Sequence, residues 1–213
     1  MLTELWPLLG LRLTTPRLEL RVPDLDDLGA LAEVAAAGVH DPAVQPFLAA
    51  WTDAPPEQRA RSTLQWHWST WARWVPDDWS LSFVVLAQGR IIGTQALSAR
   101  HFATLREVST GSWLGQDHHG QGYGTEMRVA VLELAFEGLG AEYATSGAFA
   151  DNAASLGVSR KLGYVDDGIE RHLIRDAPAV ERRLRLDRAN WAAARHVPVK
   201  IVGLEPCLPM FGL

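Results

Sequence analysis

The alternation of apolar and polar residues divides the chain into short strands and amphipathic helices. Residues 17–22 alternate strictly, as in a strand with one buried face, and Pro23 ends this strand. Asp24 can then cap a helix over 24–38, in which apolar residues recur at helical spacing. The N-terminal part of the chain therefore predicts a strand followed directly by a helix.

A second helix is expected after Pro55-Pro56, in a region that holds five of the nine tryptophans. Its apolar stripe consists of residues at helical spacing: Leu64, Trp68, Trp71 and Val75. Trp66 and Trp74 lie off this stripe, so some indole surface should be exposed, and His67 is expected to be partly exposed. Three interpretations of the cluster stay open: core packing, a surface for self-association, or one wall of a substrate pocket.

The rest of the chain alternates strands and helices. Strands are predicted over 81–87, 90–97, 107–114, 143–149, 164–175 and 180–186, and helices over 125–137 and 152–162. Only the central strand–loop–helix–strand segment requires a parallel crossover. The pattern indicates an α/β (α+β) fold built on a mixed, mostly antiparallel sheet of six to seven strands.

The chain length fits one domain with additions. We expect this domain to span 1–195, with a helical Trp-rich insertion at about 40–79, and a C-terminal tail over 196–213 that wraps over the surface.

Composition narrows the function classes. The 213 residues include 20 Lys+Arg and 25 Asp+Glu, a net charge of −5 that disfavours binding to nucleic acid.

Further features bear on the cellular setting. Cys207 has no second cysteine to pair with, which excludes a disulfide framework within the chain. No apolar run reaches 18 residues, and the N-terminus lacks the features of a signal peptide. The sequence therefore predicts a cytoplasmic protein that does not act in a membrane.

The most informative segment is 113–127, WLGQDHHGQGYGTEM, where a strand enters a glycine-rich loop and a helix follows at once. Glycines at alternate positions and an exposed helix N-terminus together favour an anion such as a pyrophosphate. The segment has no lysine for a Walker loop, and its glycine spacing departs from the Rossmann fingerprint. The alternative is a tight strand–helix turn without a ligand. His118 and His119 are adjacent and lack a third ligand, so no metal site is predicted.

Two motifs carry a family resemblance. The run 119–126, HGQGYGTE, resembles the acyl-CoA pyrophosphate loop of the GNAT N-acetyltransferases, Arg/Gln-x-x-Gly-x-Gly/Ala. The block from Asn152 and Ser155 to Lys161-Leu162-Gly163-Tyr164 is similar to the N-x-x-S…K-L-G-F run of their RimJ/RimL-like branch. The order of elements agrees over about 10–187. Segments such as GVHDP and TGSWLG further resemble an actinobacterial subgroup with members described as using succinyl-CoA.

This resemblance implies a three-layer fold with helices on both faces of the sheet and two adjacent parallel strands that splay apart. It implies transfer of an acetyl or succinyl group from acyl-CoA to a primary amine, by direct attack in a ternary complex and without a metal. Main-chain amides of 121–125 would hold the pyrophosphate. The residues that it assigns to the acyl-CoA co-substrate are Trp113, Leu114, His119, Gly120, Gln121, Gly122, Tyr123, Gly124, Thr125, Asn152, Ser155 and Arg160.

The catalytic residues depart from the family pattern. Ser159 occupies the position where many members have a tyrosine that protonates the leaving thiolate, and a hydroxyl can supply that hydrogen bond. Glu107 is the nearest carboxylate to the position where RimL-like enzymes carry a glutamate as general base, and it lies on the same strand face. His119 replaces the usual Arg or Gln, so a side-chain contact there would depend on pH.

Several questions stay open at this level. A CoA-binding regulatory or interaction protein without turnover is the alternative function, since the usual Tyr and Glu are missing. Neither the acyl donor nor the amine, a small molecule or a protein amine, is fixed by the motifs. A homo-oligomer is expected from the aromatic surface. His40 could line a substrate pocket or belong to a turn, and the arginines of 171–188 could face solvent or bind an acidic group.

Overall fold

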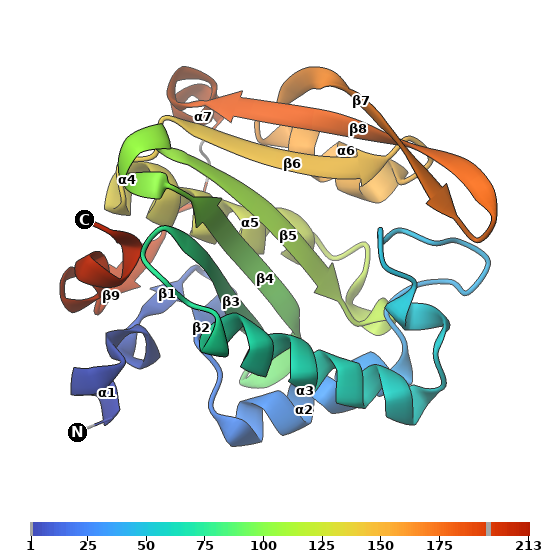
Figure 1. The fold of residues 1–213 in the computed structure, drawn as a ribbon, viewed down its shortest axis with the longest axis horizontal. Coiled ribbons are helices and arrows are strands. Elements are labelled where there is room, and N and C mark those ends of the chain that lie inside the picture. Colours follow the sequence, from blue (N-terminus) through green and yellow to red (C-terminus); the bar gives the residue numbers. More distant parts are fainter. Residues whose placement is uncertain (1, 195–196) are drawn as a thin grey trace.

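All described strands belong to one mixed sheet (Figure 1). The computed structural model describes residues 2–194 and 197–213. Within them the strand order is β7-β8-β6-β5-β4-β3-β2-β1-β9. The strands are β1 (Arg12–Thr14), β2 (Leu18–Arg21), β3 (Asp78–Ala87), β4 (Arg90–Arg100), β5 (Glu107–Leu114), β6 (Tyr143–Phe149), β7 (Val165–Ile174), β8 (Ala177–Asp187) and β9 (Lys200–Val202). Among the described strands only β5 and β6 run parallel, which confirms the predicted α+β fold with one parallel crossover.

The described sheet has nine strands rather than six or seven. The two additional strands, β1 and β9, contain three residues each and pair with one another at one edge of the sheet. Three residues are too few to show an alternation of apolar and polar positions. The seven longer strands all overlap segments that the sequence pattern predicts.

Helices cover both faces of the sheet, with α2 and α3 on one face and α5 and α6 on the other (Figure 1). Leu31 of α2 packs against Val84, whereas the next residue along β3, Val85, faces the main core that includes α5. The helices are α1 (Leu2–Leu5), α2 (Leu25–Ala37), α3 (Pro56–Ala72), α4 (Phe102–Leu105), α5 (Tyr123–Glu133), α6 (Ala153–Lys161) and α7 (Arg188–Ala194). Short 3-10 turns cover Pro7–Gly10, Trp51–Asp53, Gln116–His118 and Glu205–Phe211, and a π-helical turn, Leu134–Gly138, extends α5.

Local sequence explains two of these elements directly. The β3–β4 hairpin turns through Gln88 and Gly89, both with positive φ (51° and 75°), as a two-residue hairpin loop requires. At α2, Asp24 and Asp27 form a reciprocal capping box. Asp27 also accepts two hydrogen bonds of 2.8 Å from Arg21, and this guanidinium lowers the pKa of the buried carboxyl.

The orientation of α3 differs from the prediction. Its buried residues are Thr63, His67 and Thr70, whereas Trp68 is 46% exposed and Val75, just beyond the helix, is 50% exposed. The predicted stripe was therefore wrong by a rotation about the helix axis. The expected exposure of His67 was wrong as well: the ring is buried, and burial lowers its pKa to about 4.

The C-terminal segment is part of the core and does not only wrap over the surface. β9 pairs with β1, and Cys207 and Phe211 are fully buried. The Phe211 ring lies 4.9 Å from that of Trp79 and 5.7 Å from that of Trp74. Burial raises the pKa of the Cys207 thiol to about 11, so this thiol is a poor nucleophile at neutral pH. Among the described helices, none combines the length and apolar character needed to cross a membrane.

Candidate active site

The glycine loop reverses the chain between β5 and α5. Gly120 and Gly122 have φ values of 73° and 81°, in the left-handed region that side chains disfavour. Gly122 is the N-cap of α5, so the helix axis starts from the centre of the loop. The regular spacing of glycines in the sequence is thus explained by backbone geometry at two of the three positions.

Main-chain amides are available at this helix N-terminus. The N–H groups of Thr125 and Glu126 both donate to the Gly122 carbonyl at 3.2 Å. No hydrogen bond between described residues occupies the N–H groups of the five residues 120–124. These amides, together with the positive end of the helix dipole, form a site suited to a phosphate. Of the predicted amides 121–125, only that of Thr125 is already engaged.

An ion pair between the half-exposed Arg17 and the buried Glu126 ties the loop to the chain before β2. Glu126, 5% exposed, accepts from Thr15 Oγ1 at 2.6 Å, from Arg17 N at 3.0 Å and from Arg17 Nε at 2.6 Å. Arg17 also donates to the Gln121 carbonyl at 2.9 Å and lies 4.8 Å above the Tyr123 ring. The sequence pattern did not predict this role of Arg17, because an arginine beside a strand does not indicate a partner 109 residues away.

His119 fastens the loop to the strand that precedes it. Its Nε2 donates to the Leu114 carbonyl at 3.1 Å. Gln121 makes a similar bond through its side-chain amide to the Asp117 carbonyl, at 3.0 Å. Both side chains therefore support the main chain of the loop, while their assignment to acyl-CoA stays a prediction.

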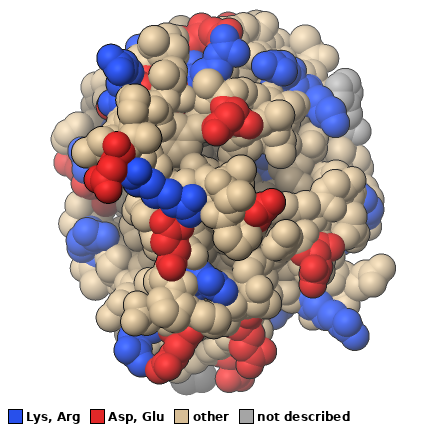
Figure 2. All heavy atoms as spheres, turned by 90° about the vertical axis from the view of Figure 1, so that its right-hand side faces the viewer, with Lys and Arg blue, Asp and Glu red and all other residues tan. Residues whose placement is uncertain are grey.

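The two parallel strands separate next to this loop. β5 and β6 pair only over three residues each, with Ser109 opposite Thr145 as the last pair. Beyond it β5 continues to Leu114 along β4, and β6 continues to Phe149 along β8. Figure 2 views the molecule from the side on which these strand ends lie and shows acidic and basic side chains interspersed. The splayed edge implied by the family resemblance is thus present.

A buried arginine bridges the splayed strands on the α5 face. Arg128, 4% exposed, donates to Ser146 Oγ at 3.2 Å and to Ser112 Oγ at 3.3 Å. Within the described residues no carboxylate lies within 4.0 Å of it, and its Nε is buried without a partner. A buried guanidinium without a carboxylate is costly, which makes this position a candidate anion site. The sequence pattern did not predict a buried Arg128, because an arginine in a helix ordinarily faces solvent.

The predicted residues of α6 lie beside the α5 N-terminus. Asn152 Oδ1 caps the helix by accepting from Ser155 N at 3.1 Å. Ser159 is fully buried, and its Oγ has no hydrogen-bond partner among the described residues. Val158, in the second half of α6, lies near Gly124 in the first turn of α5, so α6 packs beside the start of α5.

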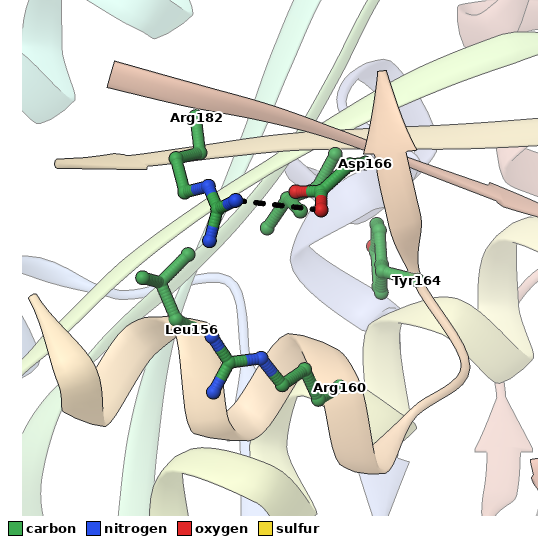
Figure 3. Close-up of a pocket in the computed structure, with 6 residues that line it drawn as sticks. Leu156, Arg160, Tyr164, Asp166 and Arg182 are labelled. Carbon is green, nitrogen blue, oxygen red and sulfur yellow. Dashed lines mark ion pairs between the residues drawn. The ribbon is translucent and has the colours of Figure 1, made fainter. Parts of the chain in front are cut away.

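Arg160 faces a small cavity of about 50 Å³ between α6 and the β7–β8 hairpin (Figure 3). Arg182 and Asp166 form an ion pair of 3.6 Å across this cavity. Arg160 itself makes no ion pair with a described residue. Arg160 is exposed, and its contact with a phosphate of acyl-CoA stays a prediction.

The remaining predicted residues lie along β5. Trp113 packs against Trp51, with ring centroids 5.7 Å apart, and Leu114 is buried at the strand end. Glu107 lies at the opposite end of β5 and forms an ion pair with Arg185, which also contacts Asp167 at 3.4 Å. The structure therefore brings Trp113 and Leu114 to the glycine loop but separates Glu107 from it by the length of the strand.

The loop between α2 and α3, residues 38–55, lies at the end of the splayed strands. Its aromatic residues His40, Phe47 and Trp51 contact one another in series and continue to Trp113. His40 bonds Thr52 Oγ1 and the Asp41 carbonyl, both at 2.8 Å, so it serves the turn. Arg175, at the tip of the β7–β8 hairpin, forms an ion pair with Asp53 of this loop.

The chain matches the family model described as acetyltransferase (GNAT) domain over residues 17–165. This match covers most of the chain, and the protein belongs to the GNAT acetyltransferase family. Its activity class is therefore that of an acyl-CoA N-acyltransferase.

Solved structures share the fold at low sequence identity. Mycobacterium smegmatis RimJ in complex with CoA-disulfide is 16% identical, with a TM-score of 0.68 over 87% of this chain and 94% of that one. A GCN5-related N-acetyltransferase from Brucella melitensis is 19% identical, with a TM-score of 0.66 over 86% and 81%. The ribosomal alpha-N-protein acetyltransferase RimL in complex with coenzyme A is 16% identical, with a TM-score of 0.63 over 81% and 95%.

Proposed function

We propose that the protein transfers an acyl group from acyl-CoA to a primary amine by direct attack within a ternary complex. One observation carries this proposal: the amides of 120–124 have no partner among the described residues and lie beside the splayed edge of β5. The amides suit the diphosphate of coenzyme A, and the free strand edge suits its amide-containing arm, which can pair as an added strand. Cys207 is buried in the C-terminal segment, which favours direct attack over a covalent enzyme intermediate.

Ser159 is the proposed hydrogen-bond donor to the departing thiolate. Its hydroxyl is buried and has no partner among the described residues, and a buried hydroxyl without a partner is costly. A thiolate that accepts from this hydroxyl would satisfy it in the reaction complex. Because a thiol has a pKa near 8.5, a hydrogen bond suffices and early proton transfer is not required.

The proposed donor is acetyl-CoA or succinyl-CoA. Arg128 supports succinyl-CoA, since a succinyl carboxylate can pair with a buried guanidinium that has no described carboxylate partner. The proposed acceptor is a small-molecule or protein amine. RimL acts on a ribosomal protein, and the shared fold makes a protein α-amine one class to test. We place the reaction in the cytoplasm.

Self-association is a further expectation. Trp66 and Trp68 of α3 are 55% and 46% exposed, and exposed indoles are enriched at protein interfaces. We propose that this helix face contributes to a homo-oligomer, which sedimentation of the wild type and of Trp66→Glu would test. A monomer in both cases contradicts this expectation and leaves the transfer reaction untouched.

The test of the function combines binding and turnover. Desulfo-CoA should raise the melting temperature of the wild type. At 100 times its Kd, the ligand should raise the free energy of unfolding by about 2.7 kcal/mol. Gly124 has ordinary φ, and an added Cβ would meet only Val158, at 3.8 Å. Gly124→Ala should therefore fold and bind, while Gly124→Glu should fold and lose the protection, because its carboxylate repels the diphosphate.

Turnover is measured as thiol release from acetyl-CoA and succinyl-CoA in the presence of a panel of primary amines. Amine-dependent release supports the proposal. Binding of CoA without release on any amine supports the alternative, a CoA-binding protein without turnover. An unchanged melting temperature with desulfo-CoA contradicts both.

A further inference from the structure

A cavity of about 470 Å³ lies where β5 and β6 diverge. Ser109 of β5 and Thr145 of β6, the last paired residues, form its base. Beyond them Gly111 and Gly147 share the same strand face, so no side chain of their own narrows the gap between the strands. The cavity therefore adjoins the strand edge that we assign to the acyl-CoA arm.

The side chain of Glu181 reaches into this cavity from β8. Glu181 is the cross-strand neighbour of Phe149, but its carboxylate lies over Gly147 two residues away. A Cβ atom at Gly147 would lie 2.0 Å from Glu181 Oε1, so only glycine leaves room for this carboxylate. The absence of a side chain at Gly147 thus places an acidic group directly against the backbone of the splayed strand.

His172 holds the carboxylate in this position. Its Nε2 lies 2.9 Å from Glu181 Oε2, and its ring packs edge-on against Phe149 at 6.1 Å. Glu170 is the direct cross-strand partner of Glu181. Ligand atoms of these three residues lie within 4.8 Å of one another, so two carboxylates share one end of the cavity.

The cations around the cavity are engaged elsewhere. Arg185 pairs with Glu107 and Asp167, and Arg183 donates to the Asp167 carbonyl. At the hairpin tip, Arg175 pairs with Asp53. No lysine or arginine of the described chain forms an ion pair with Glu170 or Glu181. Like charges opposite each other are destabilising, so this end of the cavity favours a cationic ligand.

We infer that Glu181 and Glu170 bind the ammonium group of the acceptor, and that Glu181 accepts its proton before attack on the thioester. This inference rests on the proposed acyl transfer and names the acceptor site for it. An ammonium group has no lone pair, so the proton must leave first. Glu181 lies next to both the cavity and the backbone of β6, whereas Glu107 is held by Arg185.

One ammonium proton moves to the Glu181 carboxylate, and the lone pair released on nitrogen forms the N–C bond. The electron pair of the C–S bond leaves with sulfur, which takes a second proton from nitrogen. The third hydrogen stays on the amide, and protonated Glu181 returns its proton to solvent. His172 is a positioning residue, because it acts through the Glu181 carboxylate.

The experiment compares Glu181→Gln with the wild type on amines of graded basicity, measured as thiol release from the better donor. For amines that are protonated at neutral pH, kcat/KM should fall about 100-fold, in the range that general bases supply. The loss should shrink for a weakly basic amine such as a hydroxylamine, which is already neutral at pH 7. His172→Gln should give a smaller loss with the same dependence on amine basicity.

Three controls make the outcome specific. Glu205→Gln, an exposed residue in the C-terminal turn, should behave as the wild type. Protection of Glu181→Gln by desulfo-CoA should be unchanged, because the pyrophosphate site is separate. EDTA should leave the wild-type rate unchanged, since Glu170, His172 and Glu181 also have the geometry of a metal-ligand set.

The outcomes separate this inference from the function on which it rests. Equal losses on all amines, unchanged transfer in Glu181→Gln, or inhibition by EDTA would overturn the assignment of Glu181. The same holds if Glu107→Gln, and not Glu181→Gln, shows the dependence on amine basicity. A wild type that transfers no acyl group to any amine overturns the proposed function itself.

Discussion

Two ionisable side chains, His67 in α3 and Arg128 in α5, are almost completely buried, and they differ in what surrounds them. His67 Nδ1 has no described partner, and burial lowers the pKa of the ring to about 4, so the folded protein holds it neutral. Arg128 donates to two serine hydroxyls at the splayed strands. His67 therefore makes the stability of the fold depend on pH, while Arg128 places a buried guanidinium beside the proposed ligand.

The neutral state of His67 predicts a loss of stability in acid. Its pKa is about 4 in the folded state against 6.5 in the unfolded chain, so below pH 6.5 the unfolded state binds the extra proton. The stability that the folded protein has with His67 neutral is therefore complete above pH 6.5 and is lost as the pH falls towards 4. Between pH 7.5 and 5, the wild type should lose about 2 kcal/mol more unfolding free energy than His67→Leu. Urea unfolding at both pH values measures this, and equal losses would contradict it.

The buried guanidinium of Arg128 predicts donor preference. If the acyl carboxylate pairs with Arg128, Arg128→Gln should reduce kcat/KM for succinyl-CoA by about 10-fold or more, since a hydrogen bond to a charged group contributes roughly 1.5–3 kcal/mol. Acetyl-CoA serves as the internal control, because it presents no carboxylate. Equal reductions for both donors would show that Arg128 has no part in recognising the acyl group.

At the scale of elements, the glycine loop owes its shape to contacts from distant parts of the chain. Arg17, before β2, joins Glu126 of α5 and the carbonyl of Gln121. The sequence could predict the strand, the loop and the helix, because glycine spacing and apolar periodicity are local signals. It could not predict Arg17, which acts across a separation of more than a hundred residues.

The same limit explains the error at α3. Its tryptophans suggested the buried face, yet the buried residues of the helix are Thr63, His67 and Thr70. Arg59 of α3 also donates to two carbonyls in the last turn of α2, those of Ala35 and Ala36. The pattern of apolar and polar residues predicts that a helix exists, whereas tertiary contacts decide which face of it is buried. At the site, the loop was predictable, but Arg128 and Glu181 were not, because each depends on the register of neighbouring strands.

The ion pair between Arg17 and Glu126 leads to a binding prediction. Arg17→Ala should fold, because the Arg17 side chain is about half exposed and Glu126 keeps its bonds from Thr15 Oγ1 and from the main-chain N–H of residue 17. It should bind CoA about 10-fold more weakly through loss of order in 119–124. Arg17→Lys should recover part of the affinity. Arg12→Ala, which removes another partly exposed arginine and its 3.8 Å contact to Glu19, is the matched control. Equal affinities of Arg17→Ala and Arg12→Ala for CoA, measured by calorimetry, would contradict this role of the Arg17–Glu126 ion pair.

At the scale of the whole molecule, both ends of the chain complete one edge of the sheet. β1 from the N-terminal part pairs with β9 from the C-terminal part, and Phe211 fills the core next to Trp74 and Trp79. This edge lies far from the splayed strands in the sheet order. The C-terminal segment therefore serves stability, and its short strand gave no signal in the sequence.

Removing the Phe211 ring should destabilise the whole fold. Phe211→Ala should lower the unfolding free energy by about 3–5 kcal/mol, as for other fully buried aromatic residues. Leu213→Ala, at a position that is 36% exposed, should change it by less than about 0.5 kcal/mol. Chemical denaturation compares the two variants, and similar values would mean that the C-terminal turn is not part of the cooperative core.

The central claim is that main-chain amides of 120–124 hold the diphosphate of coenzyme A. Titration of the ¹⁵N-labelled protein with CoA, followed by amide chemical shifts, tests it most directly. The account predicts large shifts for Gly120, Gly122 and Gly124, smaller ones along the end of β5, and little change in β9 and the C-terminal turn. Saturable CoA binding that leaves the amides of 120–124 unshifted would contradict the account.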